Sequence, residues 1–352
     1  MGKALANKYR PKTFDDVVGQ DYVKTILRNQ LASGEFKNAY LFTGGAGTGK
    51  TTIARIVANE MNDGKGSPIE IDGASNNGVD NIREIIDSCK FQSLDSKYKI
   101  FILDEVHMLS IGAFNALLKT LEEPPANTIF ILCTTDPQKI PATILSRVQR
   151  FQFTRIPTDS IVQRLIYILE KEQQEMPEGT TIIDWTDDAL EYIAKLANGG
   201  MRDSITMLDK VLDYDTHITE ETVVTALGAP DYEVFFDLLT AILNGDTNIC
   251  IRIVEENYLA GKDMKLFIRN FTDVILDTIK YGITDDLDLT SLPASCIEQL
   301  NFLVEPGTDD LVPLLGDMNN LCNLVKWESN PKAIIEGELI MQCNSNLLDK
   351  QE

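Results

Sequence analysis

The sequence predicts an α/β domain built on a parallel sheet, followed by two all-α domains. Three observations lead to this fold class. Five short apolar runs, rich in β-branched and aromatic residues, alternate with helical patterns over residues 1–158, as in a parallel sheet that is buried on both faces. A glycine-rich segment separates the first run from a helix. Beyond residue 158 the apolar residues follow a helical period.

The expected strands are residues 39–42, 69–71, 100–103, 129–133 and 151–153. The main expected helices are 52–58, 112–121, 187–197, 202–212, 267–279 and 311–327. Glycine and proline punctuate the chain between these elements, with a linker expected at 228–231. The predicted domains are therefore 1–158, 159–229 and 230–343, and residues 344–352 are expected to form a frayed tail.

The composition is that of a soluble globular protein and excludes several classes. Of the 352 residues, 43% are hydrophobic and 24% are charged. No apolar run approaches 18 residues, so we expect no contact with a membrane, and the N-terminus lacks the apolar core of a signal peptide. We therefore expect a cytoplasmic protein. Its six cysteines include no C-x-x-C pair, which argues against a disulfide framework or a metal site.

Charge is distributed unevenly along the chain. Residues 1–158 carry 19 Lys and Arg against 17 Asp and Glu, whereas residues 159–352 carry 13 against 37. A strongly acidic surface repels nucleic acid, so any DNA contact is expected in the first domain. The acidity itself has three open interpretations: a solvated helical surface, an acidic mimic, or a surface that docks a basic partner.

The glycine-rich segment has the pattern of a phosphate-binding loop. It reads Gly44, Gly45, Ala46, Gly47, Thr48, Gly49, Lys50 and Thr51, and the next helix continues with Thr52. Backbone N–H groups of such a loop close around phosphate oxygens, and the helix N-terminus adds positive potential. Lys50 is expected to reach the β- and γ-phosphates and Thr51 to bind Mg²⁺. The alternative is that this segment is only a glycine-rich turn that binds no ligand. The strand expected before it and the helix expected after it make that alternative less favoured.

Further candidates lie at the ends of later strands. Asp104 is expected to hold Mg²⁺, and Glu105 to polarise the attacking water. Two solvated carboxylates at a strand end are the alternative interpretation. Thr135 follows the fourth strand and can position the same water. Arg147 and Arg202 complete the set, although each arginine taken alone also fits a surface ion pair.

The order of these pieces resembles AAA+ ATPases, with a P-loop domain, a helical lid domain and a third helical domain. Several runs resemble the γ/τ subunit family of bacterial DNA polymerase III more specifically. They include Tyr9-Arg10-Pro11, the stretch from Asp104 to Ser110, and residues 114–125 and 134–141. The run 70–80 is most similar to the Gram-positive branch. The resemblance is strong over residues 5–215 and continues to about 343.

This resemblance implies an ATPase motor of the sliding-clamp loader, a five-subunit spiral. Such a machine binds ATP, opens the clamp, grips primer–template DNA and releases the closed clamp after hydrolysis. The implied cofactors are ATP and Mg²⁺. The implied partners are the sliding clamp, primer–template DNA, and either δ- and δ′-like subunits or further copies of this chain, which assemble through the third domain as a collar.

The resemblance also implies roles for particular residues. Lys50 and Thr51 bind phosphate and Mg²⁺, Asp104 is the metal partner, Glu105 is the catalytic base, and Thr135 is sensor 1. Arg147 resembles the finger inserted into a neighbouring subunit's ATP, and Arg202 resembles sensor 2 in the lid. The implied adenine-side contacts are Tyr9, Arg10, Pro11, Val17, Val18 and Gln20. Helix N-termini that face the DNA backbone are implied at Asn76, Asn77, Gly78, Arg83, Ser110, Ile111 and Gly112.

Three departures from the family pattern change these expectations. Residues 62–68 stand where the family has a four-cysteine zinc module, so no zinc is expected. Val148 replaces the family's cysteine after Arg147, while the arginine itself is kept. The chain ends after its third domain, as in the short γ form. The compact sequence also suggests a copy carried by a phage or another mobile element.

Two other functions remain open. One is a DNA-remodelling AAA+ motor of the branch-migration type, which usually ends in a winged-helix domain. The acidic residues 231–352 lack the basic recognition helix that such a domain needs. The other is a non-hydrolysing scaffold subunit like δ′, which the intact Lys50, Thr51, Asp104 and Glu105 disfavour.

Overall fold

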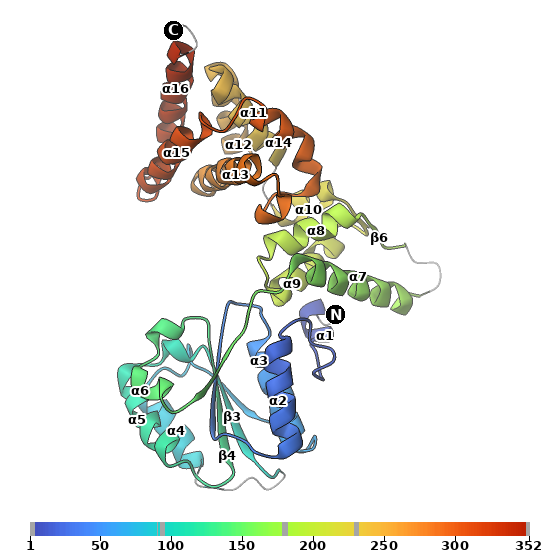
Figure 1. The fold of residues 1–352 in the computed structure, drawn as a ribbon, viewed down its shortest axis with the longest axis vertical. Coiled ribbons are helices and arrows are strands. Elements are labelled where there is room, and N and C mark those ends of the chain that lie inside the picture. The colour runs from blue at the N-terminus through green and yellow to red at the C-terminus, as the bar shows by residue number, and fades with distance from the viewer. Residues whose placement is uncertain (1–3, 90, 92–95, 178–181, 229–231, 350–352) are drawn as a thin grey trace. The chain divides into compact units, whose positions relative to one another are not determined.

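The computed structural model describes residues 4–89, 91, 96–177, 182–228 and 232–349 (Figure 1). Its contacts divide the chain into two compact units. The first unit comprises residues 1–182 and 197–210, and the second comprises 183–196 and 211–352. This division separates helices within the predicted second domain, and the three-domain arrangement stays a prediction. Of the predicted linker, Gly228 ends a helix in the left-handed conformation, and residues 229–231 lie outside the described residues.

A five-stranded parallel sheet forms the centre of the first unit, as predicted. Its strands are β1 (Ala39–Thr43), β2 (Ile69–Asp72), β3 (Lys99–Asp104), β4 (Thr128–Thr134) and β5 (Gln149–Gln152). Their order is β2-β3-β4-β1-β5, and every neighbouring pair is parallel. Because the strands are parallel, the segments after β1, β3 and β4 meet at one edge of the sheet.

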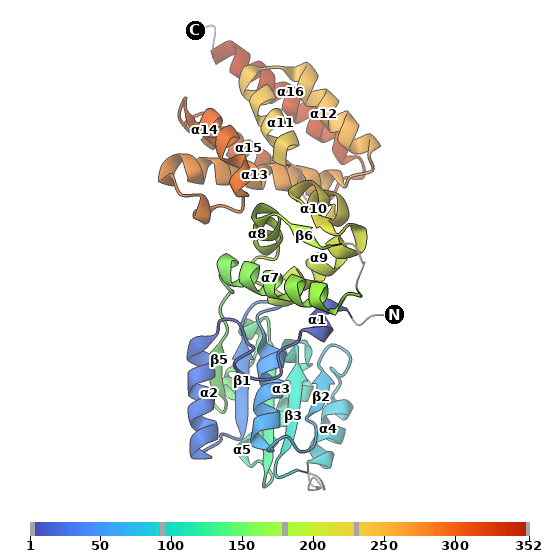
Figure 2. The same cartoon turned by 90° about the vertical axis from the view of Figure 1, so that its right-hand side faces the viewer.

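Helices cover both faces of this sheet (Figure 2). Alternate strand residues point to opposite faces, so Tyr40 and Phe42 pack against α2 (Asp21–Ser33) and α3 (Lys50–Met61). Leu41 and Phe101 pack on the other face, which is covered by α4 (Val79–Ser88), α5 (Ile111–Glu122) and the short α6 (Ala142–Leu145). Two 3₁₀ turns, η1 (Val106–Met108) and η2 (Pro137–Lys139), follow β3 and β4.

The prediction that every strand is buried on both faces is wrong for β2. This strand hydrogen-bonds only to β3 within the sheet, and all four of its residues are at least partly exposed. Ile69 is 40% exposed. An edge strand has one neighbour instead of two, and charged residues at its surface discourage pairing with other chains. Glu70 and Asp72 supply those charges.

The first unit also contains α1 (Leu5–Lys8), α7 (Thr158–Glu175) and most of α9 (Met201–Tyr214). The N-terminal segment contacts both α7 and α9 through polar interactions. The backbone N–H of Leu5 donates to Asp209 over 3.1 Å. Lys8 forms ion pairs with Glu172 at 2.7 Å and Glu175 at 2.6 Å. Helices α7 and α9 are therefore tied to the start of the chain as well as to the sheet domain.

The second unit is almost entirely helical. A large apolar core that includes Phe271 and Leu239 holds its later helices together. A two-residue parallel ribbon, β6 (Asp184–Trp185) with β7 (His217–Ile218), interrupts the helices, and the sequence pattern did not predict it because each strand is so short. The helices are α8 (Asp187–Leu196), α10 (Glu220–Leu227), α11 (Tyr232–Asn244), α12 (Thr247–Leu259), α13 (Met264–Thr284), α14 (Ile297–Val304), α15 (Leu311–Val325) and α16 (Pro331–Asp349), with 3₁₀ turns η3 (Leu287–Leu289) and η4 (Ala294–Cys296).

The last helix runs further than expected. The structure continues α16 as a helix to Asp349, which differs from the frayed tail predicted from residue 344. No glycine or proline interrupts residues 344–349, which leaves the helical pattern unbroken. Residues 350–352 lie outside the described residues. Within the described part of the chain, every helix is too short or too polar to cross a bilayer.

Candidate nucleotide-binding site

A pocket of about 570 Å³ lies in the first unit at the edge where β1 and β3 end. That volume is in the range of cofactor sites. Its wall is formed by the N-terminal segment, the phosphate-binding loop with α3, the ends of β2 and β3, Ile156 before α7, and helices α7 and α9. Among the residues predicted from the sequence, its lining includes Tyr9, Arg10, Pro11, Val17, Val18, Ala46, Gly47, Thr48, Gly49, Lys50, Thr51, Thr52, Asp104, Glu105 and Arg202.

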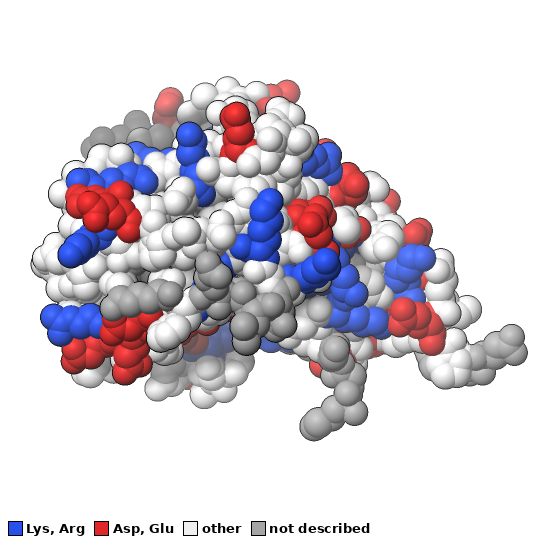
Figure 3. Space-filling view, turned by 90° about the horizontal axis from the view of Figure 1, so that it is seen from below, with Lys and Arg blue, Asp and Glu red and all other residues white. Residues whose placement is uncertain are grey.

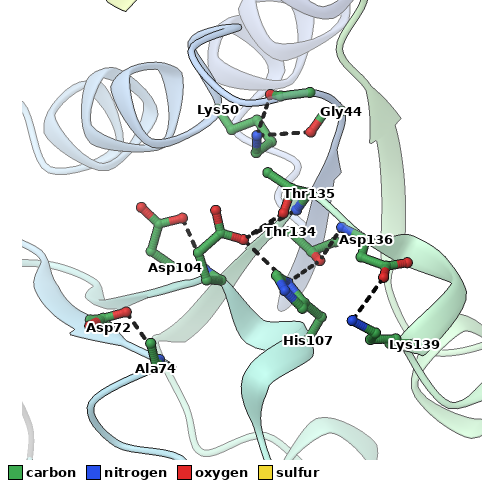
Figure 4. A network of polar contacts seen from close by, with 12 residues as sticks. Gly44, Lys50, Asp72, Ala74, Asp104, His107, Thr134, Thr135, Asp136 and Lys139 are labelled. Carbon is green, nitrogen blue, oxygen red and sulfur yellow. Dashed lines mark hydrogen bonds and ion pairs between the residues drawn. The ribbon is translucent and has the colours of Figure 1, made fainter. Parts of the chain in front are cut away.

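The phosphate-binding loop is closed around the Lys50 ammonium group (Figure 4). Its Nζ donates to the carbonyl oxygens of Gly44 at 2.9 Å and Gly45 at 2.7 Å. Gly44 has φ +149°, and a Cβ there would lie 2.4 Å from the carbonyl oxygen of Phe153, so only glycine fits. Burial lowers the pKa of Lys50, against the charges of Glu105 and Asp104, which raise it. A buried ammonium group beside a Gly-rich loop suits a phosphate ligand.

The two residues predicted to bind Mg²⁺ are in direct contact. The Thr51 hydroxyl, at the start of α3, donates to Asp104 Oδ2 at the end of β3 over 2.7 Å. Both side chains line the pocket. Hydroxyl and carboxylate oxygens are the donors that Mg²⁺ prefers, and the ion usually takes only one or two of them from the protein. The donor set therefore fits Mg²⁺ bound together with substrate phosphates.

Glu105 and Thr135 also meet, although they lie on different strands. The Thr135 hydroxyl donates to Glu105 Oε2 at 3.0 Å, and the Thr135 backbone N–H lies 3.3 Å from the same oxygen. Thr135 follows β4, the neighbour of β3, so the parallel sheet brings the two together. Thr135 is not itself part of the pocket lining. Its contact with the pocket is made through Glu105.

Several arginines also line the pocket. Arg202, at the start of α9, faces the pocket together with Arg10. Burial lowers the pKa of Arg10, and the nearby positive charges of Arg55 and Arg202 lower it further. A polyanion stabilises such a concentration of like charges. The arginines, like the buried Lys50 ammonium group, therefore fit a nucleoside triphosphate.

Two lining arginines, Arg55 and Arg164, were missed by the sequence analysis. Arg55 lies four residues after Thr51, which places both on one face of α3. That spacing is a signal the sequence contains. Arg164 lies on α7 and donates to the carbonyl oxygen of Tyr9 at 3.0 Å. Its place depends on the packing of α7 against the N-terminal segment, for which the sequence holds no local signal.

Gln20 lies behind the pocket wall rather than in it. Its side-chain amide bridges the backbone of Thr154, with Oε1 accepting from the N–H at 3.1 Å and Nε2 donating to the carbonyl at 2.7 Å. Nε2 also reaches the carbonyl oxygen of Thr48 at 3.4 Å. Gln20 thus connects the residues after β5 to the phosphate-binding loop. These hydrogen bonds hold in place the pocket wall on the predicted adenine side.

The segment before α9 packs tightly against the phosphate-binding loop within the first unit. A Cβ added to Gly47 would lie 2.9 Å from Gly200 Cα. A Cβ added to Gly200 would lie 3.3 Å from the carbonyl oxygen of Ala46. The backbone of the loop therefore touches the backbone of the turn that starts the helix carrying Arg202.

Arg147 lies apart from this pocket. Its guanidinium group pairs with Glu122 at the end of α5 and donates to the carbonyl oxygen of Thr143 at 2.6 Å. Its side chain is 33% exposed. It is absent from the pocket lining that the described residues form.

The residues predicted to contact DNA gather at the N-termini of α4 and α5. The backbone N–H of Ser110 donates to the carbonyl oxygen of Asn77 over 3.1 Å, which joins the two helix starts. Ile111 is 78% exposed, and Arg83 pairs with Asp80 at 3.1 Å. Asn76, Gly78 and Gly112 lie in the same two turns. Figure 3 views the molecule from below, and on the face shown Lys and Arg are interspersed with Asp and Glu.

The segment 62–68 is a short turn between α3 and β2. The Asn62 side chain holds it by accepting from the N–H of Tyr98 at 2.8 Å and donating to its carbonyl at 3.0 Å. Within the described ranges, no group of three or more His, Cys, Asp or Glu could hold a metal ion. Independence from zinc stays a prediction.

A zinc chelator should leave the folded chain unchanged. Because Asn62 closes the turn with hydrogen bonds to Tyr98, we expect this segment to fold without a metal. The melting temperature of the purified chain, measured with and without a strong chelator, should agree within error. Release of zinc with loss of folded protein would contradict this prediction.

Comparison with known proteins relates both units to subunits of DNA polymerase III. The model of "DNA polymerase III, delta subunit" matches residues 67–157, and that of "DNA polymerase III subunits gamma and tau domain III" matches 218–305. Subunit tau of Bacillus subtilis is 37% identical, over 98% of this chain and 64% of that protein. Subunit gamma of Buchnera aphidicola subsp. Baizongia pistaciae is 35% identical, over 78% and 76%.

The chain is shorter than several of these relatives. It spans 42% of the length of subunit tau of Escherichia coli, to which it is 36% identical. Among solved structures, the Thermotoga maritima RuvB Holliday junction branch migration motor has a TM-score of 0.50 at 21% identity, covering 66% of this chain and 79% of that one. That likeness concerns the fold alone and agrees with the predicted AAA+ architecture. Relatives named subunit gamma or tau match this chain over most of their own length, so the chain belongs to the gamma/tau subunit family of DNA polymerase III.

Proposed function

We propose that the chain is the ATP-hydrolysing motor subunit of a sliding-clamp loader, which uses ATP binding and hydrolysis to open the clamp and place it on primer–template DNA. The observation that carries the proposal is the assembly of one pocket from separate motifs. Lys50 and Thr51 start α3, Asp104 and Glu105 stand at the end of β3, and Arg202 is in α9, yet all five line the same cavity. Membership of the gamma/tau family supplies the biological setting.

The chemistry proposed for this pocket is hydrolysis of the γ-phosphate. Lys50 binds the β- and γ-phosphates, and Thr51 and Asp104 hold Mg²⁺, which supplies neutralisation of the phosphate charge when it is bound. Glu105 takes the proton of the attacking water, and Thr135 keeps that carboxylate in place. Phosphoryl transfer depends mostly on such positioning and charge neutralisation.

Arg202 and Arg147 are proposed to make hydrolysis depend on the position of the lid domain and on the presence of a neighbouring subunit. Arg202 reaches the γ-phosphate from the start of α9, in the predicted lid domain of residues 159–229. Arg147 lies outside its own pocket and serves the ATP of a neighbouring subunit. Residues 230–343 form the collar that brings subunits together. The N-termini of α4 and α5 bind the DNA backbone without reading its sequence.

The test is steady-state ATP hydrolysis by the purified chain. It is assayed alone and with δ- and δ′-like subunits, in the presence and absence of primed circular DNA and a bacterial sliding clamp. Strong stimulation by clamp and primed DNA together is the expected result. Stimulation by DNA alone, indifferent to the clamp and to primer ends, would favour a remodelling motor.

A Lys50→Ala variant tests the alternative of a non-hydrolysing scaffold. The Lys50 ammonium group is the buried cation of the phosphate-binding loop, so its loss should remove turnover. Equal residual rates for Lys50→Ala and the parent chain would make the chain a scaffold and overturn the proposed motor.

A further inference from the structure

Glu105 stands in an unusual backbone conformation. It has φ +45° and ψ +46°, in the left-handed region that non-glycine residues rarely occupy. This conformation turns the chain sharply out of β3 into η1. As a result, a residue two positions along the chain, His107, returns beside the Glu105 side chain.

His107 contacts the same carboxylate oxygen as Thr135. Its Nδ1 lies 3.2 Å from Glu105 Oε2 and is hydrogen-bonded to the Thr134 hydroxyl at 3.1 Å. That hydroxyl oxygen also accepts the backbone N–H of Asp136 at 3.0 Å. The His107 side chain is 12% exposed and Thr134 is fully buried. Figure 4 shows His107 between the Thr134–Asp136 segment and the end of β3.

The contacts of Nδ1 favour one of the two neutral tautomers of the His107 ring. A carboxylate can only accept hydrogen bonds. An unprotonated Nδ1 would direct its lone pair at Glu105 Oε2, which is electrostatically unfavourable at 3.2 Å. A protonated Nδ1 is attracted to that oxygen and can be shared with Thr134. The favourable tautomer is therefore the one with a proton on Nδ1, which is directed to the Thr134 hydroxyl and keeps a positively polarised N–H 3.2 Å from the carboxylate oxygen.

We propose that His107 is a positioning residue for the reaction, and that its Nδ1–H holds the Glu105 carboxylate beside Thr135 at the tip of β4. His107 lies outside the pocket lining, so it acts on the reaction through Glu105 and not by touching ATP. This inference rests on the proposed ATPase function and adds a residue to its machinery.

The kinetic test compares His107→Ala with His107→Asn. Asparagine places an amide N–H near the position of Nδ1, whereas alanine has no donor. His107→Ala should lower kcat by about tenfold or more, as expected when a hydrogen bond to a charged group is lost. The dissociation constant for ATP should be unchanged. His107→Asn should recover most of the rate, and His217→Asn, at the only other histidine, should match the parent.

A double-variant comparison separates positioning from a general structural effect. In a Glu105→Gln background, His107→Ala should cause little further loss, because the base that His107 positions is already removed. A full additional loss in that background would overturn the proposal. So would equal rates for the alanine and asparagine variants at equal melting temperatures.

A measurement independent of turnover keeps the inference testable if the proposed ATPase fails. The chain has two histidines, so imidazole ¹⁵N NMR gives a simple spectrum, and His217→Asn assigns it. A proton on Nδ1 of His107, with a changed signal in Glu105→Gln, is expected. An unprotonated Nδ1 would overturn the proposal whatever the ATPase result, whereas absent turnover with a protonated Nδ1 would count only against the function.

Discussion

Replacement of Arg147 by alanine should nearly abolish stimulated ATP hydrolysis in the assembled complex while ATP binding is retained. Arg147 lies outside the pocket of its own chain, so its loss leaves that pocket intact. An arginine supplied from a neighbouring subunit typically changes the rate of phosphoryl transfer by about 10³–10⁵. Turnover with clamp and primed DNA measures the effect, and binding of a fluorescent ATP analogue measures the affinity.

Arg150→Ala is the matched control for this variant. Arg150 is an exposed arginine three residues further along the chain and has no proposed role. Its variant should hydrolyse ATP as the parent does. Normal stimulated turnover in Arg147→Ala would remove the trans-acting role from this residue, and its pairing with Glu122 would then be a structural ion pair only.

Glu105→Gln should separate ATP binding from hydrolysis. Glutamine keeps the size of the side chain and an oxygen that can accept from Thr135, but it cannot take a proton from water. General base catalysis typically contributes about 10²–10⁴ to the rate, so kcat should fall by that order while ATP affinity changes little. Single-turnover hydrolysis and equilibrium binding measure the two effects.

The control for Glu105→Gln is the same change at an exposed glutamate. Glu60 lies near the end of α3 on the surface, and Glu60→Gln should leave both quantities unchanged. If Glu105→Gln lost ATP binding along with hydrolysis, the carboxylate would be serving the structure of the pocket and not the reacting water.

The parts of the fold that were predictable are those with a local signal. Residues 100–103 and 129–133 are continuous apolar runs, and both are buried strands because their composition leaves no alternative to burial. Lys50 and Thr51 could be assigned from a motif whose glycines are needed for backbone geometry. Asp104 and Glu105 could be assigned because the ends of parallel strands converge.

Other parts depend on packing that no local pattern encodes. The exposure of β2 follows from its place at the edge of the sheet, and strand order is a property of the whole chain. Gln20 was expected beside the nucleotide, yet its hydrogen bonds are to Thr154, which is distant in sequence. His107 was read only as part of a run that resembles the family. Its contact with Glu105 depends on the left-handed turn at that residue.

The close approach of Gly47 and Gly200 has a consequence for how the sequence can vary. Gly47 has φ +69° and a Cβ there would lie 2.9 Å from Gly200 Cα, so residue 47 cannot gain a side chain unless the turn before α9 moves. The phosphate-binding loop therefore cannot change its conformation independently of the turn before α9 as the sequence varies. A library in which residue 47 is randomised should return glycine almost exclusively, whatever residue stands at position 200, because the atoms in the way belong to the backbone.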